Sequence, residues 1–192
     1  MPKIGMEPIR RAALVKATIA EIGEAGTLDV TVSQIAKRAG MSSALAHHYF
    51  GGKEQIFLAA MRHVLALYSA EVRGALMMAE GPRARAEAIV RASFTSQNFR
   101  PEVIAAWLNF YVLAQMSPEA MRLLRIYHRR LRSNLVHALR PLMGDGAPAL
   151  AQRIAGLIDG LYLHQSLGQG APDGRAAAAQ VLAALGCALG EG

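Results

Sequence analysis

The sequence predicts an all-α protein of about nine helices. Leu, Ala, Met, Arg and Glu, which favour helices, dominate the chain, and alternating β-branched runs bounded by turn residues are absent. Glycine and proline interrupt the helical pattern at several points. A chain of 192 residues, 53% of them hydrophobic and one of them cysteine, can bury a core without disulfides or a structural metal.

Two helices are predicted before residue 40. The first ends near Gly26 and carries three apolar residues on one face, Val15, Ile19 and Ile22. The second begins at Thr31, whose hydroxyl fits a capping box with Gln34, and it ends at Gly40.

The third helix is capped by Ser42 and continues through Phe50 to the break at Gly51 and Gly52. A longer helix follows from about Lys53 to just before residues 81–82, and we expect four of its residues to face inward: Ile56, Ala60, Val64 and Leu67.

The later helices are separated by breaks at residues 98–101, 117–118, 144–148 and 168–174. The clearest start is at Ser117, a capping residue followed by Pro118 and the acidic Glu119.

The charge balance favours a polyanionic partner. The chain has 21 Lys and Arg against 14 Asp and Glu, a net charge of +7 and a pI near 10.1, which suits nucleic acid or an anionic membrane surface. The longest uncharged runs fall short of the ~20 residues that span a bilayer, and no charged-then-apolar leader opens the chain. We therefore expect a soluble, cytoplasmic protein that does not enter a membrane.

Residues 31 to 53 carry the strongest functional pattern, a helix-turn-helix. Ala36 and Ala39 are small enough for two helices to cross closely, Gly40 permits the turn, and Met41 fills the space between them. The third helix then points small and polar residues outward, toward a DNA major groove: Ser42, Ser43, Ala44, His47 and His48. An ordinary helical hairpin is the alternative interpretation of the pattern.

Two segments carry a specific resemblance. VSQIAKRAGMS at residues 32–42 and HYFGGKE at residues 48–54 closely resemble the DNA-binding segment of the TetR family of repressors. The resemblance covers roughly residues 9 to 65. It implies a DNA-binding domain at residues 1–53 and a ligand-sensing and dimerisation domain at residues 54–192.

The same resemblance implies roles in binding double-stranded operator DNA. Lys53, Thr31 and Ser33 are expected to contact phosphates, which agrees with the affinity of helix N-termini for anions. The outward residues of the third helix would read an inverted repeat. His47 stands where the family usually has a tyrosine that contacts phosphate. Basic residues at the start of the chain add phosphate contacts or form a plain solvated surface: Lys3, Arg10 and Arg11.

Four further segments resemble the choline-responsive members of that family: MPKIGM at residues 1–6, WLNF at 107–110, RRLRSNL at 129–135 and LIDGL at 157–161. This resemblance implies a repressor of glycine-betaine synthesis that choline or a related ligand releases from DNA. Tyr111 stands where those members lead us to expect tryptophan.

Aromatic residues make up only 6% of the chain, so their grouping is informative. Trp107, Phe110 and Tyr111 share one helix face, and Tyr127 and Tyr162 lie on helices that follow. A quaternary ammonium binds aromatic faces, and the half-buried Asp159 would supply a countercharge. The alternatives are a plain aromatic core and an Asp159 that pairs with Arg129 or Arg132.

The last two helices are expected to form a homodimer interface, because residues 149–167 are apolar on more than one face and residues 176–189 are rich in small residues. We expect no catalytic residue, metal site or cofactor, since the adjacent His47 and His48 point in different directions and Cys187 has no histidine near it in the sequence. The same features also fit a TetR-like repressor of a different apolar or cationic ligand, or an all-helical carrier or enzyme.

Overall fold

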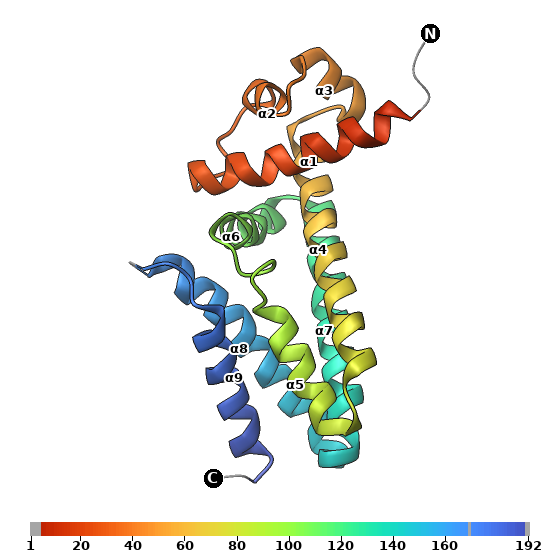
Figure 1. Ribbon diagram of the computed structural model, residues 1–192, viewed down its shortest axis with the longest axis vertical. Helices are drawn as coiled ribbons and strands as arrows, with labels where there is room; N and C mark the ends of the chain where they lie inside the picture. Colours follow the sequence, from red (N-terminus) through yellow and green to blue (C-terminus); the bar gives the residue numbers. More distant parts are fainter. Residues whose placement is uncertain (1–4, 169, 191–192) are drawn as a thin grey trace.

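The computed structural model describes residues 5–168 and 170–190 (Figure 1), so Lys3, one of the predicted phosphate contacts, lies outside this part of the chain. All of the regular secondary structure in these residues is helical, which confirms the all-α class. The helices are α1 (Met6–Ala25), α2 (Val32–Arg38), α3 (Ser43–Phe50), α4 (Lys53–Met78), α5 (Gly81–Ser93), α6 (Pro101–Met116), α7 (Pro118–Met143), the short 3₁₀ helix η1 (Gly144–Gly146), α8 (Ala147–Leu167) and α9 (Gly174–Ala188).

The helices form two groups joined by α4 (Figure 1). Helix α1 lies across one end of the molecule, with α2 and α3 on its outer side. Helix α4 starts at this end and runs along the length of the molecule beside α5 and α7, while α8 and α9 pack on the far side. Helix α6 lies between the groups and contacts both α1 and the pair α7 and α8. Among the described residues no helix is both long and apolar enough to cross a membrane.

The predicted helix starts are confirmed in detail. Thr31 and Gln34 form the capping box: the Thr31 hydroxyl accepts from the Gln34 N–H at 3.1 Å, and the Gln34 side-chain oxygen accepts from the Thr31 N–H at 2.7 Å. Ser42 and Ser117 cap α3 and α7, each accepting from the backbone N–H three residues on at 3.2 Å. These bonds satisfy N–H groups that a helix start leaves unpaired.

One predicted core position is wrong. Leu67 is 38% exposed, although Ile56, Ala60 and Val64 are buried as expected. The buried stripe of α4 advances by four residues at a time, through Tyr68 to Val72, so it turns slowly around the helix and leaves Leu67 at its edge.

Candidate DNA-binding surface and effector site

The turn between α2 and α3 is built as the helix-turn-helix requires. Gly40 adopts a left-handed conformation with φ of 68°, which a glycine reaches without strain. The Met41 N–H then donates to the Ala36 carbonyl at 2.9 Å, closing the turn. Ile35, Ala36 and Ala46 are completely buried where the two helices meet, so α3 is held by its inner face.

The outer face of this unit carries the residues predicted to bind DNA. Ser42, Ala44, His47 and His48 are exposed on or just before α3, whereas Ser43 is half-buried. Thr31 and Ser33 are exposed at the start of α2, and Lys53 is the half-buried first residue of α4. The Lys53 ammonium lies 5.6 Å from the centre of the Phe57 ring, which restrains the side chain near the end of its helix.

His47 is oriented by its own helix. Its Nδ1 lies 3.1 Å from the Gly51 carbonyl oxygen, which can accept only if Nδ1 carries a proton. In a neutral imidazole of that tautomer Nε2 is bare and accepts hydrogen bonds. His47 therefore offers a phosphate an Nε2–H donor only when the ring is protonated, unlike the tyrosine hydroxyl that the family usually has there.

Some basic residues of this region are engaged within the protein. The Arg11 guanidinium lies 5.4 Å and 5.0 Å from the ring centres of Tyr49 and Phe50, and its Nε is 2.7 Å from Glu7. Arg11 thus ties α1 to α3.

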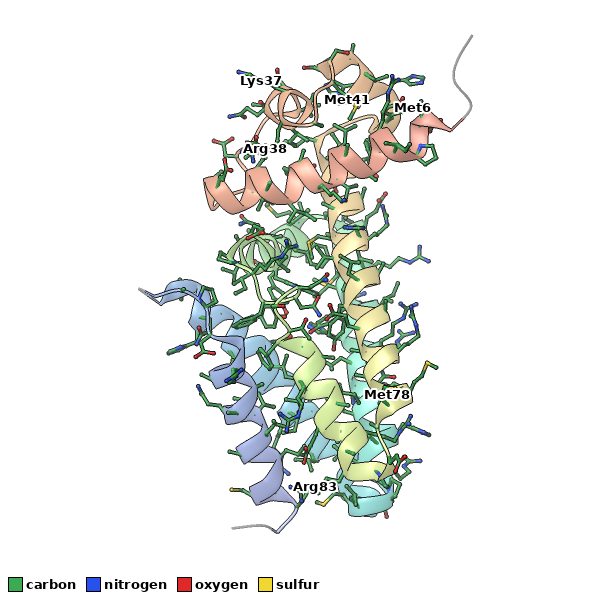
Figure 2. The ribbon with its side chains drawn as sticks, viewed as in Figure 1. Met6, Lys37, Arg38, Met41, Met78 and Arg83 are labelled. Atoms are coloured by element: carbon green, nitrogen blue, oxygen red, sulfur yellow. The ribbon has the colours of Figure 1, made fainter. Side chains whose placement is uncertain are left out.

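Two neighbouring basic residues on α2 differ in whether they pair with an acid. Arg38 pairs with Glu21 at 2.5 Å and also with Glu24, and both acids lie on α1. The hydrogen bonds to these carboxylates raise the pKa of Arg38. Lys37 is exposed and points away from α1 (Figure 2), so it adds an exposed basic residue to the helix-turn-helix that sequence reasoning missed. A helix of seven residues gives too little periodicity to separate the two.

The predicted aromatic residues come together around Trp107. The centre of its indole ring lies 4.6 Å from that of Tyr127, and 5.9, 6.1 and 6.4 Å from those of Tyr111, Phe110 and Tyr162. Tyr111 is half-buried and the other four rings are buried. Helices α6, α7 and α8 thus contribute to one cluster. Three further rings extend this cluster and were not predicted from the sequence: Tyr68, Phe94 and Phe99.

Asp159 lies at the edge of this cluster, with its side chain 26% exposed. Its Oδ1 accepts from the Tyr127 hydroxyl at 3.2 Å, and its Oδ2 lies 3.2 Å from Nε2 of His128. The alternative in which Asp159 pairs with Arg129 or Arg132 is wrong, because His128 on α7 turns toward the carboxylate instead. Nothing in the sequence marked His128 as the partner.

The tyrosine hydroxyls of the cluster remain protonated. Burial, followed by the negative charge of Asp159, raises the pKa of Tyr111 and Tyr127 above the usual value for tyrosine. Burial also raises the pKa of Tyr162, and it raises the pKa of Tyr68 to about 12. The cluster therefore presents neutral rings beside one carboxylate.

The hydroxyl of Tyr162 is occupied by the protein itself. It donates to the Ser93 carbonyl at 2.5 Å and lies 3.3 Å from the Asn98 carbonyl. The Asn98 amide in turn donates to Glu71 at 2.5 Å and to the Ala92 carbonyl at 2.9 Å. Tyr162 thus holds the α5–α6 connection, and only its ring is available to a ligand.

Helix α6 links the aromatic cluster to the helix-turn-helix. The Asn109 amide on α6 donates to the Gly26 carbonyl, at the end of α1, at 3.3 Å. Gly23 of α1 faces Glu102 so closely that a Cβ at Gly23 would lie 2.3 Å from the Glu102 Cβ. A second link joins α7 to α4, where the Ser117 hydroxyl donates to Glu54 at 2.5 Å.

Two family models match the chain. Residues 14–60 match the N-terminal model of the tetR family of bacterial regulatory proteins. Residues 82–189 match the model of the BetI-type transcriptional repressor, C-terminal. The first covers the helix-turn-helix, and the second covers the aromatic cluster apart from Tyr68, together with α8 and α9.

Curated relatives and solved structures agree with both models. The chain is 52% identical to the HTH-type transcriptional regulator BetI of Brucella anthropi over 94% of each chain, and 54% identical to that of Agrobacterium fabrum over 93% of this chain and 86% of the relative. A transcriptional regulator from Pseudomonas aeruginosa PAO1 has the same fold, with a TM-score of 0.81 at 27% identity over 95% of this chain and 91% of its own. A regulator from Saccharomonospora viridis, solved in complex with choline, has a TM-score of 0.79 at 21% identity over 89% and 92% of the two chains. The chain therefore belongs to the TetR family of DNA-binding transcriptional regulators, as a BetI-type repressor and not an enzyme.

Proposed function

We propose that the protein is a cytoplasmic homodimer that binds an inverted-repeat operator and is released by choline or a related quaternary ammonium, controlling glycine-betaine synthesis. Residues 1–53 would bind DNA, and residues 54–192 would bind the ligand and dimerise. The observation that carries this proposal is the carboxylate of Asp159 beside the rings around Trp107. The curated BetI relatives and the choline complex of the Saccharomonospora viridis regulator support the same ligand class.

The chemistry of the cluster suits a quaternary ammonium. Such a cation has no N–H to donate, so it binds through aromatic faces, each worth ~0.5–2 kcal/mol, and through an opposite charge. Asp159 supplies that charge. The proposed ligand contacts are the aromatic rings of the cluster and this carboxylate: Trp107, Phe110, Tyr111, Tyr127, Tyr162 and Asp159.

The DNA-binding roles are proposed from the exposed face of the helix-turn-helix. Ser42, Ser43, Ala44, His47 and His48 would face the major groove, and Thr31, Ser33 and Lys53 would contact phosphates. The Thr31 hydroxyl already bonds Gln34, so its phosphate contact would have to share or replace that bond.

The dimer is proposed through α8 and α9. The small residue Gly160 is exposed on α8 beside Leu163, and the small residues Ala176, Ala179 and Ala183 are exposed on α9. Small exposed residues on two neighbouring helices permit close packing against the same pair of a second copy, which would form a four-helix bundle.

The ligand would act through α6, because this helix carries Trp107, Phe110 and Tyr111 on the ligand side and contacts α1 through Asn109 and Glu102. A ligand that favours one position of α6 changes operator affinity only if it binds that position more tightly. A tenfold loss of affinity needs about 1.4 kcal/mol of such difference.

The test is operator binding by fluorescence anisotropy, with and without choline, across a range of salt concentrations. Choline is expected to release the operator. Lys53→Ala is expected to lower affinity about equally on all sequences and to reduce the salt slope by about one unit. Lys16→Ala is the matched control, because Lys16 is exposed on α1 beside a cleft shared with His63 and Glu102 and not on the helix-turn-helix face. A change of base preference in Lys53→Ala, with the salt slope intact, would contradict the assigned role.

Calorimetric titration tests the ligand. Choline is expected to bind more tightly than 3,3-dimethylbutanol, which has the same shape without the charge, and Asp159→Asn is expected to remove most of the difference. Equal binding of the two compounds would replace the cationic site with a generic apolar pocket.

A further inference from the structure

A groove between α7 and α8 opens directly beside Asp159. It has a volume of about 620 Å³, within the ~300–1,000 Å³ range of small-molecule sites. The residues that line it recur at three- or four-residue intervals, at Arg129, Arg132, Val136 and Arg140 on α7 and at Gln152, Gly156 and Asp159 on α8. One face of each helix therefore lines it, and Asp159 and His128 are shared with the edge of the aromatic cluster.

The charges of this groove are separated along its length. Among the described residues Asp159 is the only acid that lines it, and it lies at the end nearest α6. Arg132 lies four residues beyond His128 on α7, about one turn or ~6 Å along the helix. Within the described part of the chain, Arg129, Arg132 and Arg140 make no ion pair or side-chain hydrogen bond, so their guanidinium donors are free.

Two macromolecular partners for these arginines are unfavourable. The groove lies on the half of α7 that runs away from the helix-turn-helix, so DNA on α3 does not reach it. A second copy docked through α8 and α9 offers few carboxylates, because Asp159 is the only acid within either helix and faces this groove, and Asp173, which caps α9, already accepts from the Arg175 and Ala176 N–H groups. A small anion is the more favourable partner for these arginines, since guanidinium groups bind carboxylates and phosphates through paired, charge-assisted hydrogen bonds.

We infer that the effector site continues into this groove, and that its preferred ligand is a quaternary ammonium that also carries an anionic group. The inference rests on the proposed function, because Asp159 and the rings hold the ammonium. Arg132, about one helical turn away, and the nearer Arg129 bind the anionic group, a phosphate or a carboxylate. Ser133 and Gln152 line the same stretch and add neutral hydrogen-bonding groups.

The experiment is calorimetric titration of the full-length protein with choline, phosphocholine and glycine betaine, at low and high salt. At least one of the two anionic compounds is expected to bind about tenfold more tightly than choline, and whichever binds more tightly identifies the anionic group. The advantage should shrink with added salt more than choline binding does, because the arginines are exposed.

Variants assign the effect to the groove. Arg132→Gln is expected to remove most of the advantage of the anionic ligand while leaving choline affinity unchanged, and Arg132→Lys to retain more of it. Arg125→Gln is the matched control, an identical change at an exposed position of α7 outside the groove. Both positions are exposed, so unaltered thermal unfolding is expected and is checked for each variant.

The outcomes separate this inference from the proposed function. The inference is overturned if choline binds as tightly as both anionic compounds. It is also overturned if Arg132→Gln changes the ligand affinities no more than Arg125→Gln does. In either case the choline response of operator binding stands. Tight phosphocholine binding without any choline response supports the groove and removes choline as effector. Failure of all three compounds to bind overturns both.

Discussion

Gly23→Ala tests the contact between α1 and α6 on which the proposed coupling depends. The added Cβ would lie 2.3 Å from the Glu102 Cβ and 2.7 Å from the Glu102 Cα. Restoring an ordinary contact of 3.4 Å requires a movement of 3.4 − 2.3 = 1.1 Å. Because one of the two atoms belongs to the backbone of α6, a change of side-chain rotamer cannot supply that movement. The two helices have to move apart.

The expected cost follows from two opposing effects. Forcing an extra methyl into a packed contact costs about 1–3 kcal/mol, and replacing a helical glycine by alanine returns about 1 kcal/mol. Gly74→Ala is the matched control, because Gly74 also lies within a helix and its Cβ would meet nothing within 4 Å. The gain in helix propensity from glycine to alanine is the same in both variants and cancels, so Gly23→Ala should be about 1–3 kcal/mol less stable than Gly74→Ala.

Urea unfolding at a fixed protein concentration measures this difference, and anisotropy on the operator measures its functional effect. We expect weaker operator binding for Gly23→Ala alone, because a displaced α1 carries α2 and α3 with it. Two variants with the same unfolding midpoint and the same operator affinity would refute the close α1–α6 contact.

Two further predictions concern the tyrosines. Tyr162→Phe should lower the free energy of unfolding, measured in urea, by about 1–3 kcal/mol, because the Ser93 carbonyl loses its buried donor. Choline affinity should be unchanged, because the ring remains. A loss of choline affinity without a loss of stability would contradict the structural role of the hydroxyl. Alkaline pH should destabilise the protein. Burial raises the pKa of Tyr68 to about 12, against about 10 in the unfolded chain. The stability that the Tyr68 proton contributes is therefore present below pH ~10 and is lost as the pH rises toward 12. Tyr68→Phe should flatten the slope of unfolding free energy over that range by up to ~1.4 kcal/mol per pH unit, and an unchanged slope would argue against a buried, neutral Tyr68.

Local signals were the ones that could be predicted from sequence. The capping box of Thr31 and Gln34 and the caps at Ser42 and Ser117 depend on residues within one helical turn, so the sequence contains all the partners. The position of Leu67 was wrong because a stripe that advances by four residues drifts around the helix, and only the neighbouring helices decide where it stops.

The partners of the candidate site could not be predicted in the same way. His128 meets Asp159, and Tyr162 meets the Ser93 carbonyl, across sequence separations of 31 and 69 residues. Sequence spacing identified Trp107, Phe110 and Tyr111 as one face, but which side chains of α7 and α8 turn toward that face is set by how the helices pack. The groove between α7 and α8 is formed by how these two helices pack, so the sequence alone does not reveal it.

The length of α4 has a consequence for operator geometry. Its 26 residues form a rod of about 39 Å, with Lys53 at one end and the cluster residue Tyr68 past its middle. A rotation of only ~3° about the far end moves the Lys53 end by about 2 Å. In the proposed dimer two such movements in opposite directions change the separation of the recognition helices by about 4 Å, which exceeds the ~3.4 Å rise of one base pair. The same tilt moves Tyr68, ten residues from the far end, by only about 0.8 Å, so a small shift in the sensor core is enough to put the two half-sites out of register.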